Sequence, residues 1–390
     1  MNVPMQDSSR ARGTGSPNTA GFDMRDWLNP RRMTVLMWDW AFLTRHMKGD
    51  SFEDYDRVLN EAVERGYNTL RLDPIPQMID LTKPERIFSS LDTHQPFMPW
   101  ARPDACEGPL GAWLIEFVEK MQRMNLSYAL SAWGNSWDQW PDGVKIQNLQ
   151  DITTCWKTFL TEWKKRFGFD NCVYVDVSNE YPYFLSGHYE RIMAEHNGRW
   201  SPEWNAYTRQ EVNGCLRELR QMFPEVRFIL SLHGDVNWID LDLELDAMDI
   251  HFYADADQRF TDRTLFDLYM KDFFVTDSFF KDFSDRCMKG HKIMAPAYRA
   301  RQRAKLSAFS AWSQESGIPL LTSESWASWN YIDHPDLDWS WLLEWAEWSV
   351  EDAIEYKMWG WTPHNYCQPQ FENWKDVTWH RRLTEKFLRS

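Results

Sequence analysis

Two glutamates lie at the ends of apolar runs, where burial of a carboxylate costs free energy unless the group pairs or reacts. Glu180 follows Asn179 at the end of the apolar run VYVDVS, and Glu324 ends the run IPLLTSE. Burying an unpaired carboxylate is unfavourable, so each of them is expected to pair with another group or to react. Two carboxyl groups that face each other can act as an acid and a nucleophile at one acetal bond. A helix cap, an ion pair or a surface position is the alternative for each glutamate.

The chain repeats a short apolar segment followed by an amphipathic helix eight times, as parallel α/β proteins do. In the helix predicted at 51–66, Ser51 and Asp54 form a capping pattern and Gly66 marks the end. A doubly wound open sheet would want a glycine-rich phosphate turn, and the sequence has no GxGxxG or P-loop. We therefore predict a single-domain α/β fold, a (β/α)8 or TIM barrel spanning residues 26–390, after a flexible arm at 1–25. The expected strands are 32–40, 67–76, 126–134, 172–180, 226–235, 245–255, 318–328 and 356–366. The expected helices are 51–66, 111–125, 151–168, 202–223, 265–288, 302–316, 338–357 and 378–388.

Polar and aromatic residues at the ends of these strands are the other candidates, because barrel enzymes build their active sites there. Arg71 is either a site residue or a charge partner of Asp39 or Asp73 inside the barrel. His251 is either a site residue or a structural histidine, and His233 either binds substrate or only packs. The candidates for substrate binding are Asp39, Arg71, Trp133, Asn135, Asn179, His233, His251, Tyr253 and Trp361.

The amino-acid composition indicates which kinds of molecule the protein could bind. The net charge of −15, without clusters of Lys and Arg, argues against nucleic acid, and no apolar run is long enough for a membrane span. The 24 tryptophans offer faces that stack on sugar rings, which favours a carbohydrate partner. The first residues lack an apolar signal region and the six cysteines show no CxxC, so we expect free thiols and a cytoplasmic location. We expect no metal, since HExxH is absent, and no cofactor; the oligomeric state is left open.

Five spaced motifs resemble the retaining glycoside hydrolases of clan A, especially the cellulase-like members of family 5. They are Arg71 in LRLD, Asn179–Glu180 in SNEYP, His251 and Tyr253 in DIHFY, Glu324 in TSESW, and Trp361 in WGWTP. The family's usual histidine at the third strand is absent, and SAWGN offers Trp133 and Asn135 instead. The whole chain is also similar to the group described as sugar-binding, cellulase-like proteins.

The resemblance implies a barrel that cleaves β-linked oligosaccharides or glycosides with retention, through a covalent intermediate. Glu324 would be the nucleophile, held ionised by Tyr253 and Arg71. Glu180 would be the acid/base, with a pKa raised by burial and by the neighbouring charge. Asn179 would donate to the sugar 2-hydroxyl and Trp361 would form the floor of the −1 subsite. A non-catalytic carbohydrate-binding protein on the same scaffold is the alternative.

Overall fold

The computed structural model describes residues 31–91, 106–134, 146–185, 188–254, 259–260, 262, 277–329 and 331–390. Residues Arg31–Ser390 form one compact unit. The arm expected at 1–25 lies outside the described residues, so the domain boundary after residue 25 stays a prediction.

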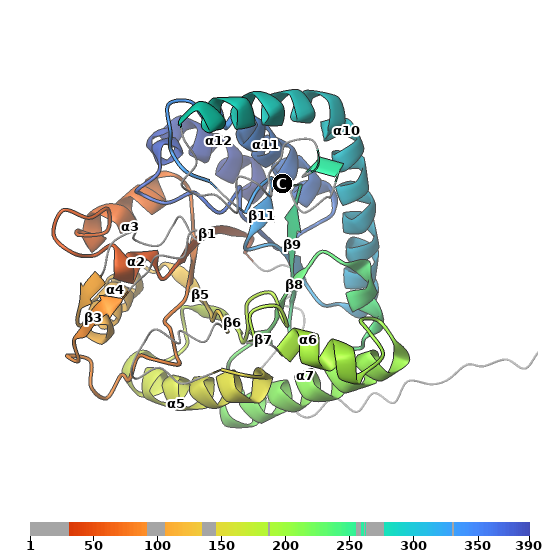
Figure 1. Ribbon diagram of the computed structural model, residues 1–390. Coiled ribbons are helices and arrows are strands. Elements are labelled where there is room, and N and C mark those ends of the chain that lie inside the picture. Colours follow the sequence, from red (N-terminus) through yellow and green to blue (C-terminus); the bar gives the residue numbers. More distant parts are fainter. Residues whose placement is uncertain are drawn as a thin grey trace, which may run out of the picture. The chain divides into compact units, whose positions relative to one another are not determined.

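The fold is the expected (β/α)8 barrel (Figure 1). Its strands run parallel, and β1 pairs with both β2 and β12. Between β6 and β9 the ring is closed by β7, which pairs with β6, and β8, which pairs with β9. Only Leu230 separates β7 from β8, so together they are one interrupted barrel strand. The barrel strands are β1 (Met33–Asp39), β2 (Thr69–Leu72), β5 (Ser127–Ser131), β6 (Cys172–Asp176), β7 (Phe228–Ile229), β8 (Ser231–His233), β9 (Met248–Tyr253), β10 (Leu320–Leu321), β11 (Ser325–Trp326) and β12 (Gly360–Trp361).

Helices surround the barrel and cover its outer face, which explains why the strands are mostly apolar. All seven residues of β1 are buried. Side chains cap several of the helices: Asp54 accepts from the amide of Arg57, Asn148 from Asp151 and Ser201 from Trp204. The helices are α2 (Ala41–Thr44), α3 (Tyr55–Glu64), α4 (Leu110–Arg123), α5 (Leu149–Phe167), α6 (His188–Glu195), α7 (Pro202–Met222), α10 (Asp277–Ser316), α11 (Ser340–Glu355) and α12 (Val377–Leu388), with the short 3-10 turns η1 (Val236–Asp240) and η2 (Glu372–Lys375).

Several elements differ from the prediction, and α6 (His188–Glu195) lies where no helix was expected. The helix expected from residue 51 begins at Tyr55, because Asp54 is its cap. A single helix, α10, replaces the two expected at 265–288 and 302–316 and continues through Pro296; residues 265–276 lie outside the described ranges. Between the strand expected to end at residue 76 and the helix expected from residue 111, where no element was expected, lies an antiparallel pair, β3 (Phe88–Leu91) and β4 (Cys106–Gly108).

Two expectations from composition can be compared with the structure. All six cysteines are free, and five of them are buried. Among the described helices, none combines the length and the apolar character that a membrane crossing requires.

Candidate active site

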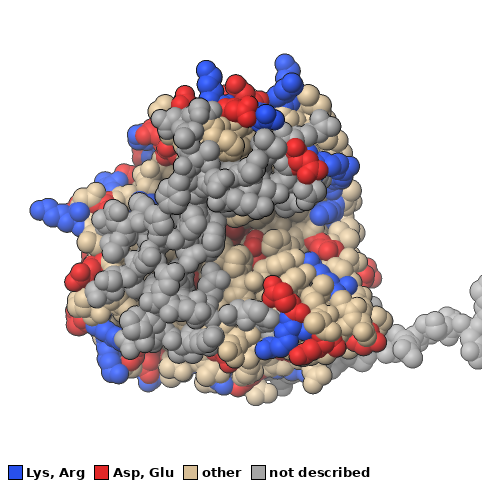
Figure 2. Space-filling model, in the orientation of Figure 1, with Lys and Arg blue, Asp and Glu red and all other residues tan. Residues whose placement is uncertain are grey.

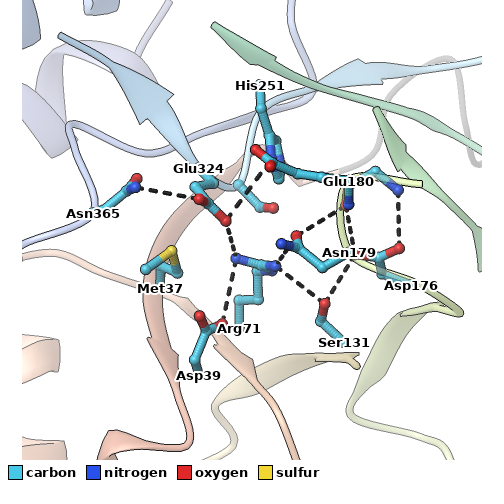
Figure 3. A network of polar contacts seen from close by, with 12 residues as sticks. Met37, Asp39, Arg71, Ser131, Asp176, Asn179, Glu180, His251, Glu324 and Asn365 are labelled. Carbon is cyan, nitrogen blue, oxygen red and sulfur yellow. Dashed lines mark hydrogen bonds and ion pairs between the residues drawn. The ribbon is translucent and has the colours of Figure 1, made fainter. Parts of the chain in front are cut away.

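The two glutamates meet at the carboxyl-terminal mouth of the barrel (Figure 3). Glu180 lies four residues beyond the end of β6, and Glu324 lies between β10 and β11. Both are nearly buried, with 5% and 2% of their surface exposed. A carboxylate oxygen of one lies within 4.8 Å of a carboxylate oxygen of the other. Figure 2 shows acidic atoms inside a hollow near the middle of this face, whose described surface mixes both signs of charge.

Glu324 is held by donors from two strands and from the segment after a third. Arg71 on β2 donates to Oε2 at 2.9 Å, and the hydroxyl of Tyr253 on β9 donates to Oε1 at 2.5 Å. Asn365, after β12, lies 3.4 Å from the same Oε1 and donates to the Tyr253 hydroxyl at 2.9 Å. Both contacts expected to hold Glu324 ionised are therefore present. The carboxylate is fixed in one orientation across the open centre of the barrel.

Glu180 lies between two histidines. His233 Nε2 is 2.8 Å from its Oε2, and His251 Nδ1 is 3.0 Å from its Oε1. Burial acts to raise the pKa of Glu180, but the charges and hydrogen bonds of the two histidines outweigh burial and lower this pKa below its usual range. The expectation of a raised pKa is thus wrong for the free protein. Glu180 therefore rests as a carboxylate.

His251 is the central cation of this group. Its Nδ1 also lies 3.8 Å from Oε2 of Glu324, and its Nε2 lies 3.7 Å from Asp249. Burial by itself would lower the pKa of His251, but Glu324, Asp249 and Glu180 together raise it to about 10. The imidazolium therefore compensates both glutamates at neutral pH.

This charge makes stability depend on pH in a definite direction. Unfolded His251 loses its proton near pH 6.5, whereas folded His251 keeps it up to about pH 10. Between these values the folded state binds more protons, so its free energy of unfolding falls as pH rises. We expect His251→Gln to flatten this fall, which thermal unfolding of both proteins from pH 6 to pH 10 measures. Parallel curves for the two proteins would contradict the assignment.

Arg71 joins the glutamates to a polar layer inside the barrel. Its guanidinium, fully buried, lies 3.3 Å from Asp39 and donates to Ser131 at 3.1 Å and to Asn179 at 2.5 Å. Burial would lower the pKa of Arg71, but the surrounding carboxylates raise it well above its usual value. Burial raises the pKa of Asp39 to about 7 despite this neighbouring cation. Arg71 thus contacts both Asp39 and Glu324, so the charge-partner alternative is present, and its use in binding substrate stays a prediction.

Asn179 is oriented by its neighbours. Its Oδ1 accepts from Arg71 and from the hydroxyl of Ser231 at 3.1 Å, which turns its NH2 group away from those donors. Within the described part of the chain, this buried Nδ2 has no hydrogen-bond partner. An unpaired buried donor is costly, so it is a group that a bound ligand would satisfy.

The backbone is strained at the two ends that carry acidic residues. Asp39 has a φ of 42° and Glu180 a φ of 48°, values in the left-handed region that residues other than glycine rarely adopt. Such outliers persist where surrounding contacts hold them, here the amide of Glu180 donating to Ser231 Oγ at 2.9 Å. The strain turns both carboxylates toward the centre of the barrel mouth.

The structure brings Trp133 to the site and keeps Trp361 out of it. Trp133 donates from its indole to Asp39 at 3.0 Å and is almost fully buried. Trp361 instead donates to Ser349 on α11 at 2.8 Å and packs against Phe387 on α12. The prediction that Trp361 forms the floor of the −1 subsite is corrected, since its side chain lies on the outer face of β12. Asn135 lies outside the described residues.

Sequence reasoning assigned no role to the residues that hold the site residues in place. Asn365 holds Tyr253, and Asp176 accepts from the hydroxyls of Ser131 at 2.9 Å and Ser231 at 2.8 Å. Asp249 binds the backbone amide and the hydroxyl of Ser323. The signal was small polar residues inside otherwise apolar strands, where only a barrel interior could satisfy them.

One group of described residues has the donor atoms for a metal ion: Glu180, His251 and Glu324. Both oxygens of Glu324 already accept from Arg71 and Tyr253, and the guanidinium adds a positive charge 2.9 Å away. Because a cation beside Arg71 and the imidazolium of His251 would be repelled, we assign no metal to this group.

A family model described as sugar-binding cellulase-like matches residues 35–388, nearly the whole chain. It agrees with the resemblance carried by the spaced motifs. No curated protein matches the sequence significantly.

Solved structures of hydrolases share the fold. A candidate glycoside hydrolase from Parabacteroides distasonis is 24% identical, with 91% of this chain and 93% of that chain covered and a TM-score of 0.73. A glycoside hydrolase family 5 mannosidase from Rhizomucor miehei is 11% identical over 92% and 94%, with a TM-score of 0.53. Cel5A from Thermotoga maritima, solved with cellobiose, is 11% identical over 94% and 100%, with a TM-score of 0.52. At these identities the likeness carries the fold alone.

Proposed function

Because the chain belongs to the sugar-binding cellulase-like family, we propose that it is a retaining hydrolase of β-linked glycosides or oligosaccharides. The family and the barrel support glycoside-hydrolase-type function in general. The finer proposal, retention through a covalent intermediate, depends on the arrangement of Glu180 and Glu324.

The observation that carries the proposal is the distance between the two carboxylates. Inverting enzymes hold their carboxyl groups about 6.5–9.5 Å apart, which leaves room for a water molecule, whereas retaining enzymes hold them about 5–5.5 Å apart. The oxygens of Glu180 and Glu324 approach within 4.8 Å. This spacing favours direct attack by one carboxylate on the anomeric carbon.

The roles follow from the contacts of each glutamate. Glu324, oriented by Arg71 and Tyr253, attacks the anomeric carbon and forms an ester. Glu180 gives a proton to the departing oxygen and later takes one from the water that cleaves the ester. The free amide N–H of Asn179 donates to the 2-hydroxyl of the sugar, a contact that strengthens in the transition state. Trp133 and Asp39 bound the sugar pocket on the side of β1 and β5.

The stereochemistry of the product tests the proposal. We expect that the protein, incubated with a panel of nitrophenyl β-glycosides, cleaves at least one of them and releases the β-anomer first, as proton NMR records before mutarotation. Initial release of the α-anomer would mean inversion. If no glycoside is cleaved while oligosaccharides quench the tryptophan fluorescence, the protein only binds sugar.

A further inference from the structure

His233 stands apart from the other partners of Glu180 because it is partly exposed. It ends β8, and 34% of its side chain is accessible, whereas the side chain of His251 is fully buried. Its ring lies 4.4 Å from the ring of Tyr183, which is itself 37% exposed. His233 therefore connects a buried carboxylate to an aromatic surface at the mouth of the site.

The two steps of a retaining reaction place opposite demands on Glu180. In the first step it must carry a proton and present it to the leaving oxygen; in the second it must be a carboxylate that accepts a proton from water. With His233 on Oε2 and His251 on Oε1, the free protein shows the second state. The first state requires one histidine to give up its contact, and only His233 has the exposure to do so.

We propose that His233 is a positioning residue that holds Glu180 as the base for the second step and withdraws when a leaving group occupies the face formed by Tyr183 and His233. The inference rests on the proposed function. Bound substrate separates the imidazole from Oε2, so Glu180 takes up a proton from solvent water and can act as the acid; the proton that it receives in the second step returns to solvent. Departure of the leaving group lets His233 return.

The charged neighbours of His233 are consistent with a movable ring. Arg199 donates to the hydroxyl of Tyr183 at 2.5 Å, and its guanidinium lies over Trp200 at 4.5 Å. Asp235 binds the indole of Trp200 at 3.2 Å through its carboxylate. His251, paired with His233 in the register of β8 and β9, shares Glu180 with it. Among these described neighbours, Glu180 is the one carboxylate that bonds directly to the His233 ring.

Each step conserves its atoms and protons. In the first, the bond from the anomeric carbon to the leaving oxygen breaks, that oxygen takes the proton of Glu180, and Glu324 bonds to the carbon. In the second, a water oxygen bonds to the carbon, its proton passes to Glu180, and Glu324 leaves as a carboxylate. His233 changes its position and transfers no proton to the substrate.

The test uses His233→Ala, His233→Gln and 2,4-dinitrophenyl β-glycosides of the sugars in the nitrophenyl panel. Dinitrophenolate departs without acid help, so kcat/KM should stay within about twofold of the wild type. Loss of the positioned base should slow the second step, so kcat and KM should fall together by about tenfold or more. The glycosyl-enzyme should accumulate in intact-protein mass spectra, and azide, which needs no base, should restore kcat. His233→Gln keeps a donor at the place of Nε2, so its kcat should fall less than that of His233→Ala.

His196→Gln is the matched control and should leave both constants unchanged, because His196 stacks on Tyr207 at 4.5 Å, whereas the histidines that bond to Glu180 are His233 and His251. A raised KM at constant kcat would mean that His233 only binds substrate, and an equal fall of kcat and kcat/KM would mean a general structural loss. Either result overturns this inference while the retaining mechanism stands. A wild type that cleaves none of the dinitrophenyl glycosides overturns both.

Discussion

Glu324→Ala should lose activity on aryl β-glycosides by about 10⁴-fold or more, in the range that removal of a nucleophile costs other hydrolases. Sodium azide should restore turnover, because the small anion fits the space left by the side chain and attacks the anomeric carbon from the same side. The product should be the α-glycosyl azide, since a single displacement inverts the β-linked substrate. Proton NMR of the isolated azide checks this outcome.

Glu180→Ala gives the complementary result that assigns the two roles. For glycosides with poor leaving groups, the rate of the first step should fall by about 10²–10⁴-fold. For dinitrophenyl glycosides this rate should fall far less, because only poor leaving groups need a proton. Azide should then yield the β-glycosyl azide, with Glu324 still forming the intermediate. Glu119→Ala, at an exposed site on α4, should behave as the wild type. Exchange of the two azide products between the variants would reverse the roles of the two glutamates.

The residues that lie close together in the site could be predicted where the fold topology alone brings them together. The carboxyl ends of parallel strands meet at one end of a barrel, so Arg71, Asn179, Glu180, Tyr253 and Glu324 converge although 253 residues separate the first from the last. Their polar type, at the ends of apolar runs, was enough to select them. No information on the orientation of side chains was needed.

The sequence could not predict on which face of its strand the side chain of Trp361 lies. Strands buried on both faces lack the alternation of apolar and polar residues that distinguishes inside from outside. Trp361 pairs with Thr34 of β1 in the barrel register and turns toward α11 and α12, where Ser349 satisfies its N–H. A tryptophan near a strand end is thus equally compatible with a sugar platform and with a helix-facing core.

The prediction that the pKa of Glu180 is raised was wrong for a related reason. Burial and a second carboxylate were visible in the sequence, and both act to raise this pKa. The pairing of β8 with β9 places His233 and His251 side by side, and both reach Glu180. Whether the pKa of Glu180 is raised or lowered depends on how the ends of β6, β8 and β9 meet. Helix α10 shows the same limit at the level of elements, because two helices were expected at 265–288 and 302–316 and a single helix continues through Pro296.

Arg71→Met should be the most destabilising substitution in the polar layer of the barrel. Methionine has a similar length and no charge, so it leaves Asp39 and Glu324 without the cation that now lies 3.3 and 2.9 Å away. Removing one partner of a buried ion pair costs about 3–5 kcal/mol of unfolding free energy. Urea unfolding measures the loss, and Arg166→Met, at an exposed end of α5, should stay within about 0.5 kcal/mol of the wild type.

The pH dependence of this loss identifies its cause. Burial already raises the pKa of Asp39 to about 7, and loss of the neighbouring cation raises it further. A carboxyl whose folded pKa exceeds its unfolded value keeps a proton that the unfolded chain releases, so stability declines as pH rises from about 4 toward the folded pKa. Protonation of Asp39 relieves the unpaired charge at low pH, and the deficit of Arg71→Met should therefore be smaller at pH 5 than at pH 8. Adding Asp39→Asn should reduce the deficit at pH 8, because the double variant removes the charge that Arg71 compensates. An equal deficit at both pH values would instead assign the loss to packing and to the contacts with Ser131 and Asn179.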